Sequence, residues 1–258
     1  PSVIWPQPER LDRAGGLAMV AIHVANNETG VIQPVVEIGR IARAAGTLTV
    51  FDAVQAAGRL KLFISEGWAD FLVLSSHKIG GPKGAGAIAA ASDLLMPRPL
   101  VSGGGQEKGH RAGTENVTAI AGFGAAAVEA AENLGSMREV VRKRDAIEAA
   151  VLEIAPGATI FGSDAPRLPN TVFFGLPGMK AETAQIAFDL AGIALSAGSA
   201  CSSGKVGPSH VLRAMGYGEN AGALRVSIGI ATTDREVEAF REALAAIVAR
   251  QFGASRAA

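Results

Sequence analysis

The segment FLVLSSHKIGGPKG, residues 71–84, decides how the rest of the chain is interpreted. Its first four residues form a short apolar run typical of a buried strand, and the glycines and proline that follow indicate a tight turn. Lys78 therefore stands just after the carboxyl end of a strand, where open α/β sheets bind their ligands. A lysine there can act as an amine nucleophile that forms a Schiff base with a carbonyl cofactor. A solvated surface lysine is the alternative if these residues are taken alone.

The composition is that of a globular α/β protein with a large core. The chain has 258 residues, of which 48% are hydrophobic and 19% charged. The 24 Lys and Arg against 24 Asp and Glu give zero net charge, so we expect neither nucleic acid nor a membrane as partner. A single cysteine excludes an internal disulfide and suits a reducing compartment, which predicts a cytoplasmic protein.

The first half of the chain alternates strand-like and helix-like segments, which predicts a mostly parallel sheet. Apolar runs indicate strands, and a stretch with apolar residues at helical spacing, opened by Pro34 and closed by Gly46, indicates a helix. The expected strands cover residues 17–25, 48–51 and 71–74, with 86–91 as an antiparallel neighbour, and the helix covers 34–45.

Polar residues follow each of the three parallel strands, so they are expected to meet at one edge of the sheet. Asp52 near an amine nucleophile could keep a pyridine nitrogen protonated, although alone it would more often be a helix cap or a surface acid. Gln55 and Asn27 could bond the ring hydroxyl, and two further residues could donate to a phosphate. These two are Ser75 and His77. Together with Lys78, the set matches the arrangement of a pyridoxal 5'-phosphate site.

The second half is expected to form a smaller α+β domain. We place the boundary near a pair of helices, which gives a large domain of residues 1–130 and a small domain of residues 131–258. Strands are predicted at 171–174, 193–196 and 224–228, and helices at 137–154, 180–190 and 234–250, the last with Thr233 as cap.

Two residues of the second half are candidates for chemistry. The single cysteine, Cys201, lies among glycines and serines, which favours an accessible thiolate over an inert buried thiol. Arg225 interrupts an apolar strand, and because an unpaired guanidinium is costly to bury, we expect it to face an anion such as a substrate carboxylate. The histidines at 23, 110 and 210 are isolated, and no chemistry is assigned to them.

Six motifs taken together resemble the cysteine desulfurases, pyridoxal-phosphate enzymes of the aspartate-aminotransferase fold type within the class-V aminotransferase superfamily. They occur in consistent order over nearly the whole chain, which makes the resemblance more specific than any one of them. The motifs are ANNETG at 25–30, DAVQ at 52–55, SHKIGGPKG at 76–84, GGQE at 104–107, RAGTEN at 111–116 and SACS at 199–202. The SACS loop resembles the group that serves iron–sulfur cluster assembly and nitrogenase maturation.

The resemblance implies a reaction and a role for each site residue. Lys78 would be the Schiff-base lysine and general base, and Asp52 would partner the pyridine nitrogen. Cys201 would take the sulfur of L-cysteine as a persulfide, leaving L-alanine, and pass it to a sulfur acceptor or scaffold protein. Arg225 and Asn27 would bind the substrate. The cofactor is pyridoxal 5'-phosphate, held also by Gln55, Ser75, His77 and, across a homodimer, Thr114; no metal is expected.

One departure from the family's pattern lies at the start of the chain. Family members carry a preceding segment with a phosphate-binding turn and a histidine that stacks on the ring, and neither occurs before Leu17. We therefore expect a chain that lacks the amino-terminal segment, which a separate fragment could supply. The alternatives are another class-V aminotransferase or a selenocysteine lyase, neither of which needs Cys201, and a truncated, non-catalytic scaffold.

Overall fold

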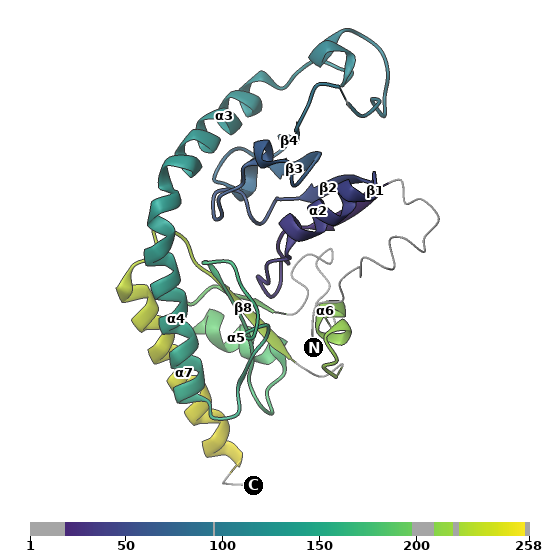
Figure 1. Ribbon diagram of the computed structural model, residues 1–258. Coiled ribbons are helices and arrows are strands. Elements are labelled where there is room, and N and C mark those ends of the chain that lie inside the picture. The colour runs from purple at the N-terminus through teal and green to yellow at the C-terminus, as the bar shows by residue number, and fades with distance from the viewer. Residues whose placement is uncertain (1–18, 95, 198–208, 219–221, 256–258) are drawn as a thin grey trace. The chain divides into compact units, whose positions relative to one another are not determined.

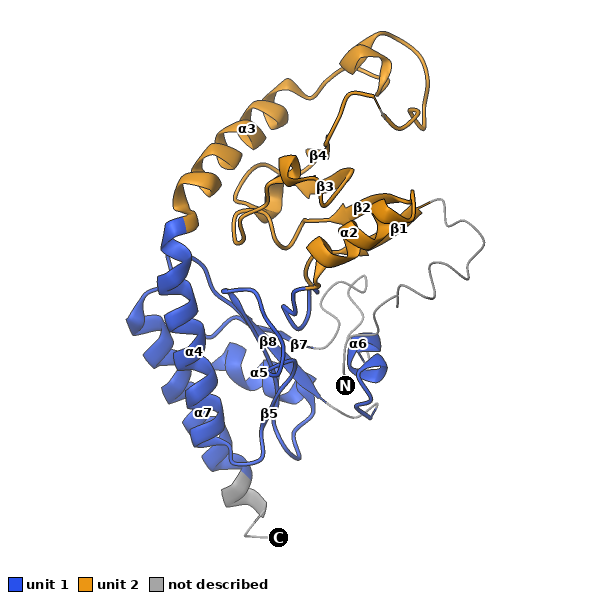
Figure 2. Cartoon of the chain, viewed as in Figure 1, with its two compact units in different colours: residues 1–3, 26–32, 135–258 blue, residues 4–25, 33–134 orange. Residues whose placement is uncertain are grey.

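The computed structural model describes residues 19–94, 96–197, 209–218 and 222–255, which form two compact units (Figures 1 and 2). Of these residues, unit 2 (orange in Figure 2) holds 19–25 and 33–134, and unit 1 (blue) holds 26–32 and those from 135 onward. The loop that follows the first strand is thus grouped with the carboxy-terminal part of the chain. No helix among the described residues has the length and apolar composition that a membrane crossing requires.

Unit 2 is built on a four-stranded sheet in which the first three strands are parallel and the fourth is antiparallel. This mixed, largely parallel sheet confirms the predicted topology. In spatial order, the strands are β1 (Met19–His23), β2 (Leu48–Asp52), β3 (Phe71–Ser75) and β4 (Gly86–Ala90).

Helix α2 (Val35–Ala44) covers one face of this sheet with its buried residues. It can lie close because Gly39 has no side chain: a Cβ there would sit 1.8 Å from Trp68 O. Beneath the helix, Phe51 and Trp68 stack with ring centroids 5.9 Å apart. The opposite face carries the exposed apolar side chains of Met19 and Ile88, each about half exposed.

The parallel register is fixed at the amino-terminal ends of β2 and β3 by one side-chain pair. Asp70 Oδ2 accepts hydrogen bonds from Thr49 N at 2.7 Å and Thr49 Oγ1 at 2.9 Å, and Asp70 N donates to Thr49 Oγ1 at 2.9 Å. A shift of one residue in this register would break all three bonds and turn the buried side chains to the other face of the sheet. The bonds therefore also fix where the carboxyl ends of β2 and β3 lie relative to each other.

Unit 1 contains a wholly antiparallel sheet with helices on one face. The long helices α4 (Met137–Ile154) and α7 (Asp234–Ser255) run side by side (Figure 1). In the core that they cover, Phe188 stacks on Phe240 with ring centroids 5.5 Å apart. On the other face, Leu212 of the short helix α6 packs with Phe173. The strands, in spatial order, are β5 (Thr159–Ile160), β6 (Thr171–Gly175), β8 (Ala223–Ser227) and β7 (Ser196–Ala197); the helices are α4 (Met137–Ile154), α5 (Ala181–Leu190), α6 (His210–Ala214) and α7 (Asp234–Ser255).

The predicted strand at 193–196 is the clearest error in the secondary structure. Only Ser196 and Ala197 pair with β8, while Ile193 and Leu195 pack against the core without joining the ladder. Apolar burial alone therefore produced the strand-like pattern. The remaining elements of the described residues are α3 (Val117–Glu132), capped by Asn116, and the 3-10 helices η1 (Ile64–Glu66), η2 (Ser76–Lys78), η3 (Gln106–Gly109) and η4 (Asn133–Ser136).

Candidate active site

The carboxyl ends of β2 and β3 bring a carboxylate and a lysine to the same edge of the sheet in unit 2. Asp52 is the last residue of β2 and is paired in the ladder with Val73 of β3. Strand β3 ends two residues later at Ser75, and η2 follows at once with Lys78 as its last residue. The two functional groups therefore follow adjacent parallel strands, at the edge where such sheets bind ligands.

Asp52 is accessible and positioned by the chain that follows it. Its Oδ1 accepts a hydrogen bond from Val54 N at 2.9 Å, and the residue is exposed. This bond turns the chain back after β2 and presents the carboxyl group at the strand end. Gln55 lies in the same turn and is partly buried.

Ser75 and His77 form a polar pair beside the lysine. Ser75 Oγ and His77 Nδ1 lie 2.9 Å apart, within hydrogen-bonding distance. The bond joins the end of β3 to the turn that carries Lys78, so it restrains the imidazole at the strand end. A hydroxyl and an imidazole are both able to donate to a phosphate oxygen. His77 is exposed and Lys78 is partly buried.

Helix α3 supports the turn after Lys78. Ser76 is fully buried, and a Cβ at Gly81 would lie 2.3 Å from Ser76 Oγ and 3.1 Å from the Ala126 side chain on α3. Only a glycine fits at this crossing, which explains the glycine-rich sequence that follows the lysine.

His23, to which the sequence assigned no chemistry, lies beside Asp52. It ends β1, and the ladder pairs it directly with Asp52 of β2. Desolvation lowers the pKa of His23, and the negative charge of Asp52 opposes that change. The isolated position of His23 in the sequence gave no hint of this pairing, which depends on strand register.

Asn27 lies in unit 1, in a loop of residues 26–32 that is held by its own side chains. Asn26 Oδ1 accepts hydrogen bonds from Glu28 N at 2.9 Å and Thr29 N at 3.0 Å. Thr29 Oγ1 in turn accepts one from Val31 N at 3.1 Å. Asn and Thr side chains commonly bond nearby backbone groups in tight turns, and here they fix the conformation of the loop.

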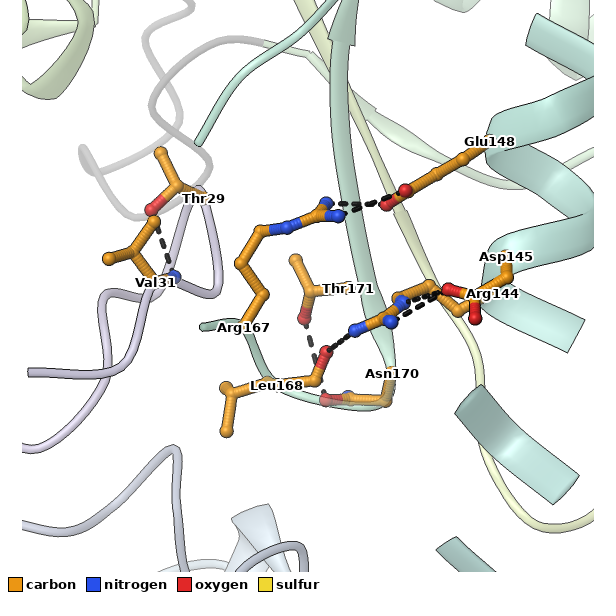
Figure 3. A network of polar contacts seen from close by, with 9 residues as sticks. All are labelled: Thr29, Val31, Arg144, Asp145, Glu148, Arg167, Leu168, Asn170 and Thr171. Carbon is orange, nitrogen blue, oxygen red and sulfur yellow. Dashed lines mark hydrogen bonds and ion pairs between the residues drawn. The ribbon is translucent and has the colours of Figure 1, made fainter. Parts of the chain in front are cut away.

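Residues 166–168 hold the same loop through two backbone hydrogen bonds: Ile32 N donates to Pro166 O and Leu168 N donates to Gly30 O, both at 2.8 Å. Figure 3 shows Arg167 and Leu168 with their polar contacts and the loop residue Val31. Arg167 pairs with Val31 in an isolated antiparallel bridge, and its guanidinium makes two hydrogen bonds to Glu148 of α4. Arg144 of the same helix donates to Leu168 O at 3.0 Å. The Arg167–Glu148 pair is largely buried and bidentate, so it fixes geometry better than an exposed pair would.

Arg225 of β8 reaches this loop. Its Nη1 donates to Asn27 O at 2.7 Å, and its Nη2 lies 3.5 Å from Ser196 Oγ of β7. The Nε atom is buried and has no hydrogen-bond partner in the described part of the chain. Asn27 O and Ser196 Oγ are both neutral, so these contacts orient the guanidinium but do not balance its positive charge. The charge is therefore available to bind an anion.

Two predicted site residues need separate mention, one in the loop before α3 and one outside the described part of the chain. Thr114 is exposed in the loop before α3, where Arg111 Nη1 donates to its carbonyl at 3.1 Å. Its proposed contact with a cofactor phosphate stays a prediction. Cys201 lies outside the described residues, and its role also stays a prediction. Among the described residues, no group of three or more His, Cys, Asp or Glu is arranged to hold a metal ion.

Sequence reasoning also missed two polar residues that contact the site segments. Glu28 is buried at 2% exposure, and its place in the ANNETG motif was the signal that the sequence offered. Arg59 follows the DAVQ motif by four residues, and its two hydrogen bonds depend on turn geometry that no sequence pattern indicates.

Comparison with known proteins agrees with the motifs. A sequence model described as "Aminotransferase class-V" matches residues 13–240. A cysteine desulfurase from Enterobacter agglomerans is 42% identical over 236 residues, covering 91% of this chain and 59% of the relative. A cysteine desulfurase from a Nostoc species is 40% identical over 239 residues, covering 92% of this chain and 60% of the relative. The chain thus spans about three fifths of the length of these curated relatives.

A solved structure shows the same fold. The NifS-like protein from Rickettsia africae superposes with a TM-score of 0.81 at 36% identity, covering 92% of this chain and 63% of that chain. The likeness confirms the predicted fold class, a pyridoxal-phosphate-dependent transferase fold of α/β type. It also agrees with the resemblance inferred from the six motifs.

Proposed function

The chain belongs to the class-V aminotransferase family, and we propose that it acts as a pyridoxal-phosphate-dependent cysteine desulfurase. The observation that carries the proposal is the placement of Asp52 and Lys78 at the carboxyl ends of adjacent parallel strands, next to the Ser75–His77 pair. Relatives that carry the name cysteine desulfurase at about 40% identity support the choice within the family. L-cysteine is the proposed substrate.

The side chains at this edge of the sheet fit pyridoxal phosphate by their chemistry. Lys78 offers an amine for the cofactor's aldehyde carbon, and Asp52 offers an accessible carboxylate for the pyridine nitrogen. Ser75 and His77 would hold the phosphate, and Gln55 would contact the ring. When bound, the cofactor supplies an electron sink for negative charge at the α-carbon of an amino acid.

Lys78 and Arg225 carry the proposed steps on the substrate. The amine of Lys78 would take the α-proton as general base, because it sits on a supported turn at the strand end. Arg225 would bind the substrate carboxylate, since Asn27 O and Ser196 Oγ orient its guanidinium but leave its charge unbalanced. Asn27, in the same loop, would contact substrate and cofactor.

Cys201 would accept the sulfur. Its thiolate would attack the sulfur of L-cysteine, a new S–S bond would form, and the electron pair of the broken C–S bond would go to the β-carbon. The β-carbon would then take a proton, and the α-carbon would regain the proton that Lys78 removed. The sulfur is oxidised, the carbon is reduced, and the products are L-alanine and a persulfide on Cys201. An acceptor protein, for example one that assembles iron–sulfur clusters, would take the outer sulfur.

The assembly and location that we propose follow the sequence argument. A homodimer would let Thr114 reach the cofactor phosphate of the other subunit, and the single cysteine suits a cytoplasmic setting.

The proposal can be tested with purified chain, pyridoxal phosphate and L-cysteine, comparing wild type with Cys201→Ser. We expect both proteins to bind cofactor, and a spectral change on adding cysteine, but alanine and bound sulfane sulfur only from the wild type. Equal sulfide release from both would favour a lyase that needs no protein thiol. Transamination products without sulfur release would favour an aminotransferase, and absence of any cofactor absorbance would favour a scaffold.

A further inference from the structure

Arg59 connects the two turns that carry the candidate cofactor residues of unit 2. Its Nη1 donates to Gln55 O at 2.9 Å, and its Nη2 donates to Lys78 O at 3.1 Å. The first turn follows β2 and Asp52, and the second follows β3. One guanidinium therefore joins the chain after the proposed pyridine partner to the backbone of the proposed Schiff-base lysine.

The Lys78 carbonyl needs a side-chain donor because the local backbone offers none. In a helical turn its partner would be the N–H three or four residues later. Gly81 N instead donates to Ser76 O at 3.0 Å, and Pro82 has no N–H. Arg59 Nη2 fills this gap, so its removal would leave a carbonyl of the lysine turn without that donor.

Arg59 is partly buried without an acidic partner among the described residues, so its two hydrogen bonds to carbonyl oxygens are the polar contacts that its burial provides. It is partly buried, and it forms no ion pair with any described carboxylate. Burial lowers the pKa of Arg59 below its usual value, in agreement with the absence of an ion pair to the described carboxylates. A Cβ at the adjacent Gly58 (φ +70°) would lie 3.4 Å from Ile79 Cγ2, so the two turns also come close at this glycine.

We propose that Arg59 is a positioning residue for Lys78, holding the lysine turn at a fixed place relative to the Asp52 strand end. The proposal rests on the proposed function, because the lysine's reactivity is what the position serves. A planar guanidinium can donate to both carbonyls at once from a rigid fork, whereas a lysine ammonium at the end of a flexible chain cannot reproduce that geometry. Arg59→Lys should therefore behave like Arg59→Met.

The test compares wild type, Arg59→Lys, Arg59→Met and the control Arg43→Met, which removes an exposed arginine from α2 of the same unit. The first measurement is hydrogen exchange at the amides of Ile79 and Gly81, without cofactor. The second is borohydride reduction in the presence of pyridoxal phosphate, followed by peptide mass analysis of labelling at Lys78. The strand amides of Val20 and Phe51 report general loosening of the unit.

We expect both Arg59 variants to exchange faster at Ile79 and Gly81 and to label Lys78 less, each by about tenfold, as loss of a charge-assisted hydrogen bond implies. The strand amides and the Arg43→Met control should match wild type. Unchanged exchange and labelling, or equal loosening of Val20 and Phe51, would overturn the proposal. Wild-type labelling away from Lys78 would count against the proposed function, while the exchange measurement would still decide the role of Arg59.

Discussion

Ser209 Oγ donates a hydrogen bond to the carboxyl group of Glu28, 181 positions earlier in the chain, and both residues are buried. The same hydroxyl accepts a bond from Leu212 N at 3.1 Å and so caps helix α6. One serine thus joins the helix that follows residues 198–208, which include Cys201, to the loop that carries Asn27. The hydroxyl donates its single proton to Glu28 and accepts the helix N–H with a lone pair, so it makes both bonds at once.

Replacing Ser209 by alanine should destabilise unit 1. The change removes the helix cap, worth about 0.5–2 kcal/mol, and leaves the buried Glu28 carboxyl without its donor, worth about 1–3 kcal/mol. We expect the free energy of unfolding, measured by urea titration, to fall by about 1.5 kcal/mol or more. Ser227→Ala, at an exposed strand end, should change it by less than about 0.5 kcal/mol. Equal effects of the two changes would contradict the role given to the contact.

Replacing Lys78 by alanine should abolish the visible absorption of bound pyridoxal phosphate and all turnover of cysteine. The reason is that the lysine amine is the proposed covalent attachment point and the proposed base. Lys83→Ala is the matched control, because Lys83 is an exposed lysine five residues further along the same glycine-rich turn. A wild-type spectrum from Lys78→Ala, measured by absorbance after gel filtration, would end the assignment.

The strand ends of unit 2 could be predicted because each depends on a local pattern. A short apolar run followed by polar residues marks a buried strand and its end, and this located Asp52 at the end of β2 and Lys78 just after β3. Helix α4 was predicted with both ends correct, since its apolar residues recur at helical spacing and Gly135 precedes it. These elements are fixed by residues close in sequence.

The contacts that position the site could not be predicted because they join distant segments. The Arg59 bond to Lys78 O spans 19 positions, and the Glu28–Ser209 bond spans 181. The grouping of residues 26–32 with unit 1 depends on pairing with residues 166–168, for which Arg167 gave no signal. Strand β5 was missed since a two-residue strand has no period to recognise.

Replacing Arg225 by alanine should weaken binding of L-cysteine far more than binding of cofactor. A charge-assisted contact to a carboxylate is worth about 1.5–3 kcal/mol, so the Kd for cysteine should rise by about tenfold or more. Binding can be followed by the cysteine-induced spectral change at fixed cofactor. Arg213→Ala, which removes an exposed arginine from α6, serves as the control. Loss of cofactor in parallel with loss of cysteine would show that Arg225 is structural.

Acid should weaken the start of helix α7 through one capping carboxylate. Glu236 Oε2 accepts hydrogen bonds from Thr233 N at 2.7 Å and Thr233 Oγ1 at 2.9 Å, and Glu236 N donates back to Thr233 Oγ1 at 3.3 Å. The backbone bond first, then the hydroxyl bond, lowers the pKa of Glu236 below its usual 4.5. This reciprocal pair is a capping box, and it confirms Thr233 as the predicted cap.

The sign of the pH effect follows from the lowered pKa. Because the folded state binds the proton on Glu236 less readily than the unfolded state, the stabilisation is complete above pH 4.5 and is lost as pH falls through the folded pKa. Asp234, whose pKa is lowered by its hydrogen bond to Arg142 at 2.6 Å, adds a second acid-sensitive contribution.

Glu236→Gln should therefore reduce, but not remove, the fall in melting temperature that occurs as the pH is lowered from 6 into the acid range. Glu238→Gln, two residues further along the exposed side of the same helix, should leave that slope as in wild type. Equal slopes for Glu236→Gln and wild type, measured by circular dichroism melts across this pH range, would show that the capping box does not contribute to acid sensitivity.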